Sequence, residues 1–465
     1  MEQIGRRTVL GTGLGLAGAA LAMPHIARAA ATTINIWWNE GFYPAEDAAF
    51  HRLVRDWEKA SGNKAQVLML PVGPLNTRII AAITSGAVPD VWYSDTGASQ
   101  IVPQNAWHGK LVDVSDVVET QKSEYLPTAL TASRFYNAVE KRRSYYGVPY
   151  KTAVLILHVW RSLVEKAGYK LSDMPQQWDQ LCAWFWPMQE KLRHKGMRRI
   201  YANGFQLDTS DGSADPNNTF EAFLIAHGGV GIVDPHGRLQ ANDPAVRKAA
   251  VDSVAFLTNA YKKGYVPPGS LDWNDASDNN AYHAQEIMMD FDATISTEVA
   301  EIDNKQWYYH DMAAFPLPND VNGKPTPPVL GAEIACISQG AKNVKPAKEF
   351  LTYLIQPKVV DAYLVEALGR WTPVMPKVMH SNPFWLDPKN PPVRVQTSSV
   401  LGPTVPPFYS YNPAWAVVLA QHIWPGAADD VLLHNMTPEQ AVANAFNRVK
   451  AVFDQYQIPQ STASK

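Results

Sequence analysis

The sequence has little of what redox, metal or phosphate chemistry requires. Two cysteines among 465 residues cannot supply a disulfide framework or a cysteine-ligated metal cluster. The patterns H-E-x-x-H and G-x-S-x-G and the P-loop are missing, and the 12 histidines are scattered. Only 18% of the residues are charged, and 41 basic side chains stand against 44 acidic ones. Without a basic excess, the composition gives no support for binding to nucleic acid.

The chain is nevertheless long and rich in aromatic residues. An apolar fraction of 46% in 465 residues is enough for more than one hydrophobic core. Aromatic residues make up 11%, with 15 tryptophans, and 35 prolines indicate many stiff connections. Large rings beside few charges suit a ligand that stacks and takes neutral hydrogen bonds, although a large core also uses tryptophan.

The two cysteines are predicted to be buried, unpaired thiols. Cys182 stands in a predicted helix beside Trp184 and Trp186, whereas Cys336 stands in a strand-like run at 333–337. A single disulfide between them is the alternative in an oxidising compartment.

Residues 1–29 have the pattern of an export signal. Arg6-Arg7 precede a Gly/Ala/Leu run at 9–22, and a small-x-small cleavage site follows at 27–29. The run is too short and too rich in glycine for a stable membrane span. The paired arginines resemble a twin-arginine export signal, which predicts a periplasmic protein. Residues 13–18 fit G-x-G-x-x-G, but no strand precedes them, so we do not interpret them as a dinucleotide site.

After this segment, strand-like and helix-like segments alternate, which is the pattern of an α/β fold. The predicted helix at 45–61 carries apolar residues at intervals of three or four, which indicates one buried face. These residues are Ala49, Phe50, Leu53, Val54 and Trp57. The first predicted elements are a strand at 33–38, this helix, a strand at 64–70, a helix at 76–85 and a strand at 89–93.

A series of short motifs follows in a characteristic order. They are Ser85-Gly86-Ala87-Val88-Pro89-Asp90-Val91-Trp92, Tyr146-Gly147-Val148-Pro149-Tyr150, Met174-Pro175-Gln176-Gln177-Trp178, Ala226-His227-Gly228-Gly229, Gln285-Glu286-Ile287-Met288-Met289 and Val344-Lys345-Pro346-Ala347-Lys348-Glu349-Phe350-Leu351. In type and order these motifs resemble those of the extracellular solute-binding proteins of ABC importers, specifically the family that binds sugars and oligosaccharides. The chain departs from that family at Val159-Trp160, where Tyr-Asn is usual, and at Gly331-Ala332, where a Gly-Gly turn is usual.

This resemblance implies an α/β, two-lobed periplasmic-binding-protein fold with a hinge and a ligand cleft between the lobes. Lobe one would comprise residues 32–150 plus 319–371. Lobe two would comprise 151–318 plus 372–460, which includes a helical C-terminal tail. The chain would cross between the lobes near 149–152, 315–318 and 371–374, where extended segments flanked by proline suit a hinge.

A sugar site needs polar groups for paired hydroxyls and rings for the apolar C–H face. Open α/β sheets bind ligands at the carboxyl ends of their strands. The predicted contacts on lobe one are therefore Asn39, Glu40 and Tyr43 after the first strand and Asp95 after the third. The alternatives are local turns or helix caps and, for Tyr43, packing in the core.

The predicted contacts on lobe two lie in two polar segments. Gln206 and Asp208 belong to a long polar loop, and Asp290 and Asp292 follow a strand-like run. The alternative for both aspartates is to cap the turn that follows. The acidic run at 272–278 lacks the turn glycine and the distal glutamate of a calcium loop, so we interpret it as a solvated loop.

Further candidate contacts lie late in the chain. Glu333 follows Gly331 at a strand start, where glycine permits close approach of a ligand. Arg370 and Trp371 offer a fork of donors beside a ring, with an inter-lobe ion pair as the alternative. The densest aromatic stretch is predicted to supply a stacking platform from one of Tyr409, Tyr411 and Trp415.

Together these features predict a periplasmic receptor that performs no covalent chemistry and needs no cofactor. It would act as a monomer, close on a sugar or oligosaccharide, and deliver it to the transmembrane subunits of an ABC permease. One alternative is a secreted carbohydrate-active enzyme such as a glycosidase, which needs two carboxylates roughly 5–10 Å apart. The other is a receptor for polyols, peptides or aromatic acids.

Overall fold

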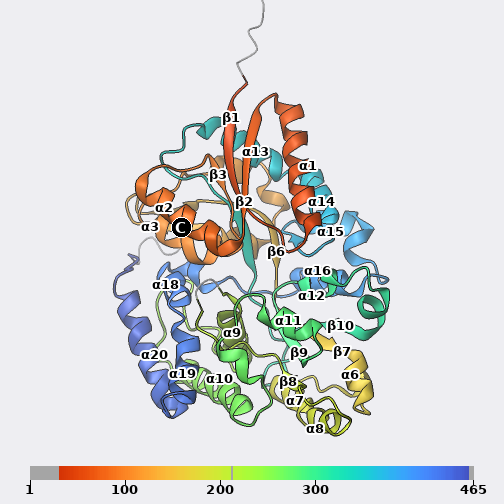
Figure 1. Ribbon diagram of the computed structural model, residues 1–465. Helices are drawn as coiled ribbons and strands as arrows, with labels where there is room; N and C mark the ends of the chain where they lie inside the picture. The colour runs from red at the N-terminus through yellow and green to blue at the C-terminus, as the bar shows by residue number, and fades with distance from the viewer. Residues whose placement is uncertain (1–30, 211–212, 460–465) are drawn as a thin grey trace, which may run out of the picture. The chain divides into compact units, whose positions relative to one another are not determined.

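The computed structural model describes residues 31–210 and 213–459, so the predicted export signal at 1–29 lies outside the described residues. The described residues from Thr32 onward form one unit. Within it the sheets lie in two lobes, which are the upper and lower halves of the view in Figure 1.

The predicted N-terminal alternation of strands and helices is present, and its strands form a parallel sheet. Strands β1 (Thr33–Asn39), β2 (Lys64–Leu70) and β3 (Val91–Trp92) pair in the order β2-β1-β3. The crossovers are α1 (Pro44–Ser61) and α2 (Val72–Ser85), and the five apolar positions predicted for α1 are all buried. Helix α2 begins at Val72 rather than Asn76, and β3 is shorter than predicted.

A second sheet in the upper lobe joins three distant parts of the chain. Strands β11 (Gly331–Ala335) and β12 (Thr372–Pro373) both run antiparallel to β6 (Val148–Ala153). The other elements of this lobe are η1 (Gly97–Ile101), α3 (Val102–Trp107), α4 (Ser115–Glu119), η2 (Lys122–Glu124), α5 (Pro127–Ala132), the hairpin β4 (Arg134–Asn137) and β5 (Arg142–Tyr145), α13 (Val344–Leu354), α14 (Pro357–Glu366) and α15 (Pro376–Ser381).

The lower lobe is built on a mixed sheet of order β10-β7-β9-β8. Its strands are β7 (Ile156–Trp160), β8 (Tyr201–Asn203), β9 (Ile287–Asp292) and β10 (Met312–Phe315). The helices between these strands are α6 (Arg161–Lys166), η3 (Leu171–Asp173), α7 (Trp178–Trp184), α8 (Trp186–His194), α9 (Asp215–Ala226), α10 (Pro244–Lys262), η4 (Pro268–Leu271), α11 (Ser277–His283), α12 (Ser296–Ala300) and η5 (Trp307–Asp311).

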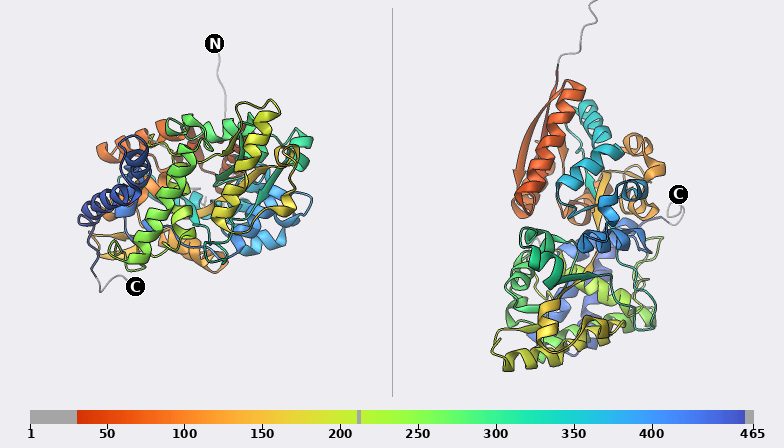
Figure 2. Two further views of the ribbon diagram at one scale, coloured as in Figure 1. Left: turned by 90° about the horizontal axis from the view of Figure 1, so that it is seen from below. Right: turned by 90° about the vertical axis from the view of Figure 1, so that its right-hand side faces the viewer.

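The C-terminal part of the chain is helical, as predicted. Its last helix, α20 (Pro438–Phe453), starts with a capping box in which Thr437 and Gln440 satisfy each other's backbone N–H groups. It packs on α10 beside α19 (Ile423–Leu432), as Figure 2 also shows. The elements between the upper lobe and α19 are η6 (Pro383–Leu386), α16 (Pro391–Leu401), α17 (Phe408–Tyr411) and α18 (Ala414–Ala420).

One extended run of chain enters both sheets. Strand β6 ends at Ala153 and β7 begins at Ile156, so the chain passes from one sheet to the other at Val154–Leu155. After α14 the chain pairs again with β6, since Thr372 lies opposite Thr152. The exact lobe boundaries given by the sequence stay a prediction.

The interior contains two large clusters of buried apolar side chains. Cys336 belongs to the cluster that fills the upper lobe and extends into the C-terminal helices, and Cys182 belongs to the cluster of the lower lobe. Both cysteines are buried free thiols.

Candidate functional site

A cavity of about 460 Å³ lies between the two lobes and receives side chains from both. The parallel sheet supplies part of its upper wall. Asn39 and Glu40 come directly after β1, Pro71 comes after β2, and Asp95 follows β3. Because the carboxyl ends of parallel strands meet at one edge of the sheet, three segments that are far apart in sequence converge on this cavity.

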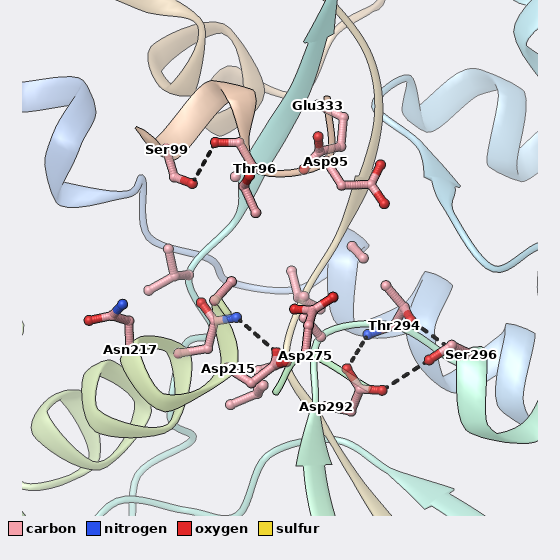
Figure 3. Close-up of a pocket in the computed structure, with 18 of the residues that line it drawn as sticks. Asp95, Thr96, Ser99, Asp215, Asn217, Asp275, Asp292, Thr294, Ser296 and Glu333 are labelled. Carbon is pink, nitrogen blue, oxygen red and sulfur yellow. Dashed lines mark hydrogen bonds between the residues drawn. The ribbon is translucent and has the colours of Figure 1, made fainter. Parts of the chain in front are cut away.

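The lining of the cavity is strongly acidic. Figure 3 shows Asp95 and Glu333 on the upper wall and Asp215, Asp275 and Asp292 on the lower wall. Arg370 is the single cationic side chain among the described residues that line it. The complete set of acidic lining residues is Glu40, Asp95, Asp215, Glu221, Asp275, Asp292 and Glu333.

Arg370 is held in the upper wall by two carboxylates. Its Nη1 lies 3.0 Å from Oε2 of Glu46 and 3.9 Å from Oδ2 of Asp95. Burial alone would lower the pKa of Arg370, but the charges of Glu46 and Asp95 outweigh it and raise the pKa above its usual value. The preceding Gly369 has a φ of +74°, a left-handed conformation that side chains disfavour. Because Glu46 and Asp95 both hold it, the guanidinium of Arg370 is a fixed cation at the edge of the cavity.

Lys151 lies behind this wall in a cage of rings. Its Nζ is 4.1 Å from the ring centre of Trp371 and 4.5 Å from that of Tyr93, and 3.8 Å from Oδ1 of Asp95. Burial lowers the pKa of Lys151, although the nearby carboxylates partly offset it. The cage fixes the ring of Trp371, whose side chain is only 7% exposed.

Glu333 faces the same cations from strand β11. Burial and the charge of Asp95 raise the pKa of Glu333 to about 8, while Lys151 partly offsets the shift. Its Oε2 is buried without a hydrogen-bond partner among the described residues. The carboxyl group of Glu333 is therefore protonated more readily than an ordinary glutamate, and in that form it can donate as well as accept a hydrogen bond.

Asp292 is the most firmly held acid of the lower wall. Its Oδ2 accepts hydrogen bonds from Nδ2 of Asn279 and Oγ of Ser296, each at 3.1 Å, and its Oδ1 accepts from the backbone N–H of Thr294 at 3.4 Å. The carboxylate lies at the end of β9, where that strand reaches the cavity, and Figure 3 shows the bonds to Thr294 and Ser296.

The other lower-wall acids repel one another. Burial is the main cause that raises the pKa of Asp275 to about 6, and the negative charges of Asp95 and Asp292 add to it. Burial and the charge of Asp275 raise the pKa of Asp215 well above its usual value. Burial also raises the pKa values of Asp278 and Asp290, and the charge of Asp292 adds to the shift of both. The acids of the lower wall are thus crowded, and the charge of Arg370 on the upper wall only partly offsets the shift of Asp275.

A ring and two polar side chains complete the cavity. Tyr409 lines it from α17 and stacks on Phe135, with ring centres 6.4 Å apart. Asn217 and Glu221 line it from α9. Glu221 is buried, and its Oε1 accepts a hydrogen bond of 2.6 Å from Nε1 of Trp415.

The structure brings together eight of the predicted site residues in this cavity. They are Asn39, Glu40, Asp95, Asp292, Glu333, Arg370, Trp371 and Tyr409. Asn39 also joins two loops, because its Oδ1 accepts from the backbone N–H of Asp95 at 3.4 Å. That all eight contact a ligand stays a prediction.

The remaining six predicted residues lie outside the cavity lining. The hydroxyl of Tyr43 donates to the carbonyl of Ala367 at 2.8 Å, and Trp415 is buried against Glu221. Asp208 accepts from the backbone and the hydroxyl of Ser210. Gln206 and Asp290 are buried in the lower lobe, and the carbonyl of Tyr411 accepts from Arg143.

Several residues of the cavity were not among the predicted contacts. The interpretation of 272–278 as a solvated loop is wrong in part, because Asp275 lines the cavity and Asp278 is 1% exposed at the start of α11. Asp215, which lines the cavity, and Lys151, which lies behind its upper wall, were also missed. The density of aspartates in that run was the available signal, but a sequence does not say which of them face inward.

The family of the chain is decided by comparison with known proteins. Residues 43–361 match the family described as "Bacterial extracellular solute-binding protein". The chain belongs to this family. Among curated proteins, none matches the sequence of this solute-binding protein. Since the family consists of solute-binding proteins, the comparison supports a receptor rather than a glycosidase, and it places the protein outside the cytoplasm.

Solved structures of solute-binding proteins share the fold of this chain. An ABC transporter solute-binding protein from Thermotoga lettingae, bound with α-D-tagatose, has a TM-score of 0.74 at 20% identity, over 91% of this chain and 100% of its own. The GacH receptor of Streptomyces glaucescens, studied with acarbose, gives 0.72 at 19%, over 92% and 100%. The maltotriose-binding protein of Thermus thermophilus gives 0.66 at 18%, over 90% and 100%. The α/β, two-lobed fold predicted from the sequence is therefore confirmed.

Membrane-spanning helices and metal-binding clusters are both missing from the described residues. Within residues 31–210 and 213–459, no helix combines the length and apolar character needed to cross a membrane. In the same residues, no three His, Cys, Asp or Glu side chains converge closely enough to hold a metal ion.

Proposed function

We propose that this solute-binding protein captures a sugar or oligosaccharide in the cavity between its lobes and delivers it to the membrane subunits of an ABC permease. The observation that carries the proposal is the composition of the cavity walls. Carboxylates, amides and a guanidinium from both lobes surround it, and the rings of Trp371 and Tyr409 border it. These are the groups that address paired hydroxyls and an apolar sugar face.

The size of the cavity and the solved relatives support the same solute class. A volume of about 460 Å³ falls within the range of small-molecule sites, roughly 300–1,000 Å³. The relatives with this fold carry α-D-tagatose, acarbose or maltotriose.

A thermal-shift screen of the mature protein tests the proposal. Sugars, polyols and short peptides are compared, because a ligand that binds only the folded state raises the melting temperature. We expect sugars to raise it and the other two classes to leave it unchanged. Product analysis after long incubation should recover the sugars intact. A response to polyols or peptides alone, or turnover of a sugar, would refute the proposal.

Export by the twin-arginine route to the periplasm is part of the same proposal. It rests on Arg6-Arg7 and the run that follows them. Replacing the pair with Lys-Lys should trap the precursor in the cytoplasm, whereas Arg28→Lys serves as the control and should not. Normal export of the Lys-Lys variant would assign the protein to the general secretory route.

A further inference from the structure

The lower wall of the cavity is lined by acidic side chains that have no cationic partner among the described residues. Asp215, Asp275 and Asp292 all line this wall, and no described lysine or arginine forms an ion pair with any of them. The cations of the upper wall are already engaged, because Arg370 pairs with Glu46 and Asp95, and Lys151 pairs with Asp95. The two lobes thus present carboxylates to each other across the cavity, as Figure 3 shows.

Carboxylates that face each other across a cavity favour a positively charged ligand between them. A cation between the two acidic walls is attracted by both. This attraction is strongest where water is partly excluded, because the effective dielectric constant is lower there. Burial and neighbouring carboxylates raise the pKa values of Asp215 and Asp275, so a bound cation would favour the ionised forms of both side chains. A neutral sugar would donate hydrogen bonds to these groups but would leave the repulsion in place.

Two residues of the cavity lining also carry buried polar atoms that have no hydrogen-bond partner among the described residues. The side chain of Trp371 is 7% exposed and its Nε1 has no acceptor among the described residues. The side chain of Asn217 is 4% exposed and its Oδ1 has no donor among them. Both residues line the cavity. An occupant that reaches these atoms would have to offer a hydrogen-bond acceptor to the indole and a donor to the amide.

These observations distinguish between classes of cation. A bare metal ion cannot accept a hydrogen bond from an indole N–H, and the described acids do not converge on a metal-sized point. A simple alkyl diamine would neutralise the lower wall but would leave the indole N–H without an acceptor. A sugar with an amino group supplies a cation, hydroxyl oxygens and a C–H face in one molecule.

We propose that the solute is an amino sugar, and that the carboxylates of Asp215, Asp275 and Asp292 receive its protonated amine. This inference rests on the proposed function and narrows its substrate class. The hydroxyl groups of the sugar lie toward the upper wall, where Arg370 and Trp371 supply donors.

Matched pairs of sugars test the inference by calorimetric titration. The probes are glucosamine against glucose, and the β-1,4-linked disaccharide of glucosamine against cellobiose, at a pH that keeps the amines protonated. The N-acetylated disaccharide adds bulk at the same position without charge. We expect the free amine to bind at least tenfold more tightly than both neutral counterparts, and this preference to shrink as salt screens the charges.

Two substitutions link the preference to the lower wall. Asp275→Asn keeps the shape of the side chain, so the variant is expected to fold normally, and it should weaken binding of the amine by about five- to tenfold. Asp215→Asn should have a similar effect. Asp272→Asn removes an exposed charge from the same segment outside the cavity lining and should change nothing.

The outcomes separate this inference from the proposed function. If the hydroxyl sugars bind as tightly as the amino sugars, or if Asp275→Asn and Asp215→Asn keep the full preference, the inference is overturned and the proposed function stands. If 1,4-diaminobutane binds and no sugar of either charge does, both are overturned. Failure of every probe to bind also overturns the inference.

Discussion

Nη1 of Arg370 lies 3.0 Å from Oε2 of Glu46, and the two residues belong to the same lobe. The sequence left an inter-lobe ion pair as the alternative role for Arg370, but its partner comes from α1, which packs against α14 just before Arg370. The same Glu46 oxygen accepts a 2.7 Å hydrogen bond from the backbone N–H of Phe42. Glu46 therefore fixes the guanidinium beside the cavity without lining the cavity itself.

Removing the charge of Glu46 should weaken sugar binding through Arg370. We expect Glu46→Gln to raise Kd by about three- to tenfold, and Arg370→Ala to raise it by about 5- to 150-fold, or about 1–3 kcal/mol. A matched control is Arg52→Gln, which breaks an exposed ion pair between α1 and Glu366. Titration calorimetry should give a wild-type Kd for that control. A wild-type Kd in Glu46→Gln would show that Arg370 needs no positioning.

Trp371 should contribute both its ring and its N–H group. Trp371→Ala removes stacking area and exposes Lys151, and we expect a loss of about 1–3 kcal/mol in affinity. Trp371→Phe keeps a ring over the lysine but loses the indole donor, so its Kd should fall between wild type and Trp371→Ala. The control is Trp385→Phe, whose indole donates to Asp361 away from the cavity. Equal affinity in all four proteins would remove Trp371 from the site.

The stability of the unliganded protein should fall as pH rises from 5 to 8. Burial raises the pKa of Glu221 to about 7, although the hydrogen bond from Trp415 partly offsets it. The folded state thus holds this proton more tightly than the unfolded state, so its contribution is complete below the ordinary pKa near 4.5 and is lost as pH approaches 7.

Glu221→Gln keeps the acceptor for Trp415 and removes the titration. Over that pH range the wild-type free energy of unfolding should fall by about 2–3 kcal/mol more than that of the variant. Asp275 and Glu333 titrate in both proteins, so the difference isolates Glu221. Denaturant unfolding at several pH values measures it, and parallel pH profiles would contradict the assignment.

The two thiols should be unreactive until the protein unfolds. Cys182 and Cys336 are fully buried in different clusters, and burial raises the pKa of each well above its usual value. A thiol reagent should label neither cysteine in the native protein and both after denaturation without reductant. An intact mass two units lower, with no labelling, would reveal a disulfide instead.

The fold could be predicted because its signals are local. The spacing of Phe50, Leu53 and Trp57 marks one helix face, and alternating strands and helices predict a parallel sheet whose strand ends carry Asn39 and Asp95. The lower wall could not be predicted in the same way. Asp275 and Asp278 have the same residue type and lie three positions apart, yet only tertiary packing places one at the cavity and the other in the interior.

The aromatic residues near the C-terminus are a second case in which the sequence does not predict which side chain lines the cavity. Tyr409 and Trp415 stand close together in sequence, and both have rings suited to a sugar face. Tyr409 lines the cavity from α17, whereas Trp415 turns inward to meet Glu221 of α9. Which ring reaches the cavity depends on how α18 packs on α9, and no short motif encodes that choice.

The most direct test of the central claim is a crystal structure of the mature protein grown with the sugar that gives the largest thermal shift. The account predicts electron density for that sugar in the cavity between the lobes, in contact with Asp95 or Trp371 on one side and with Asp292 or Asp275 on the other. A sugar bound to one lobe alone, or at a position outside this cavity, would contradict it.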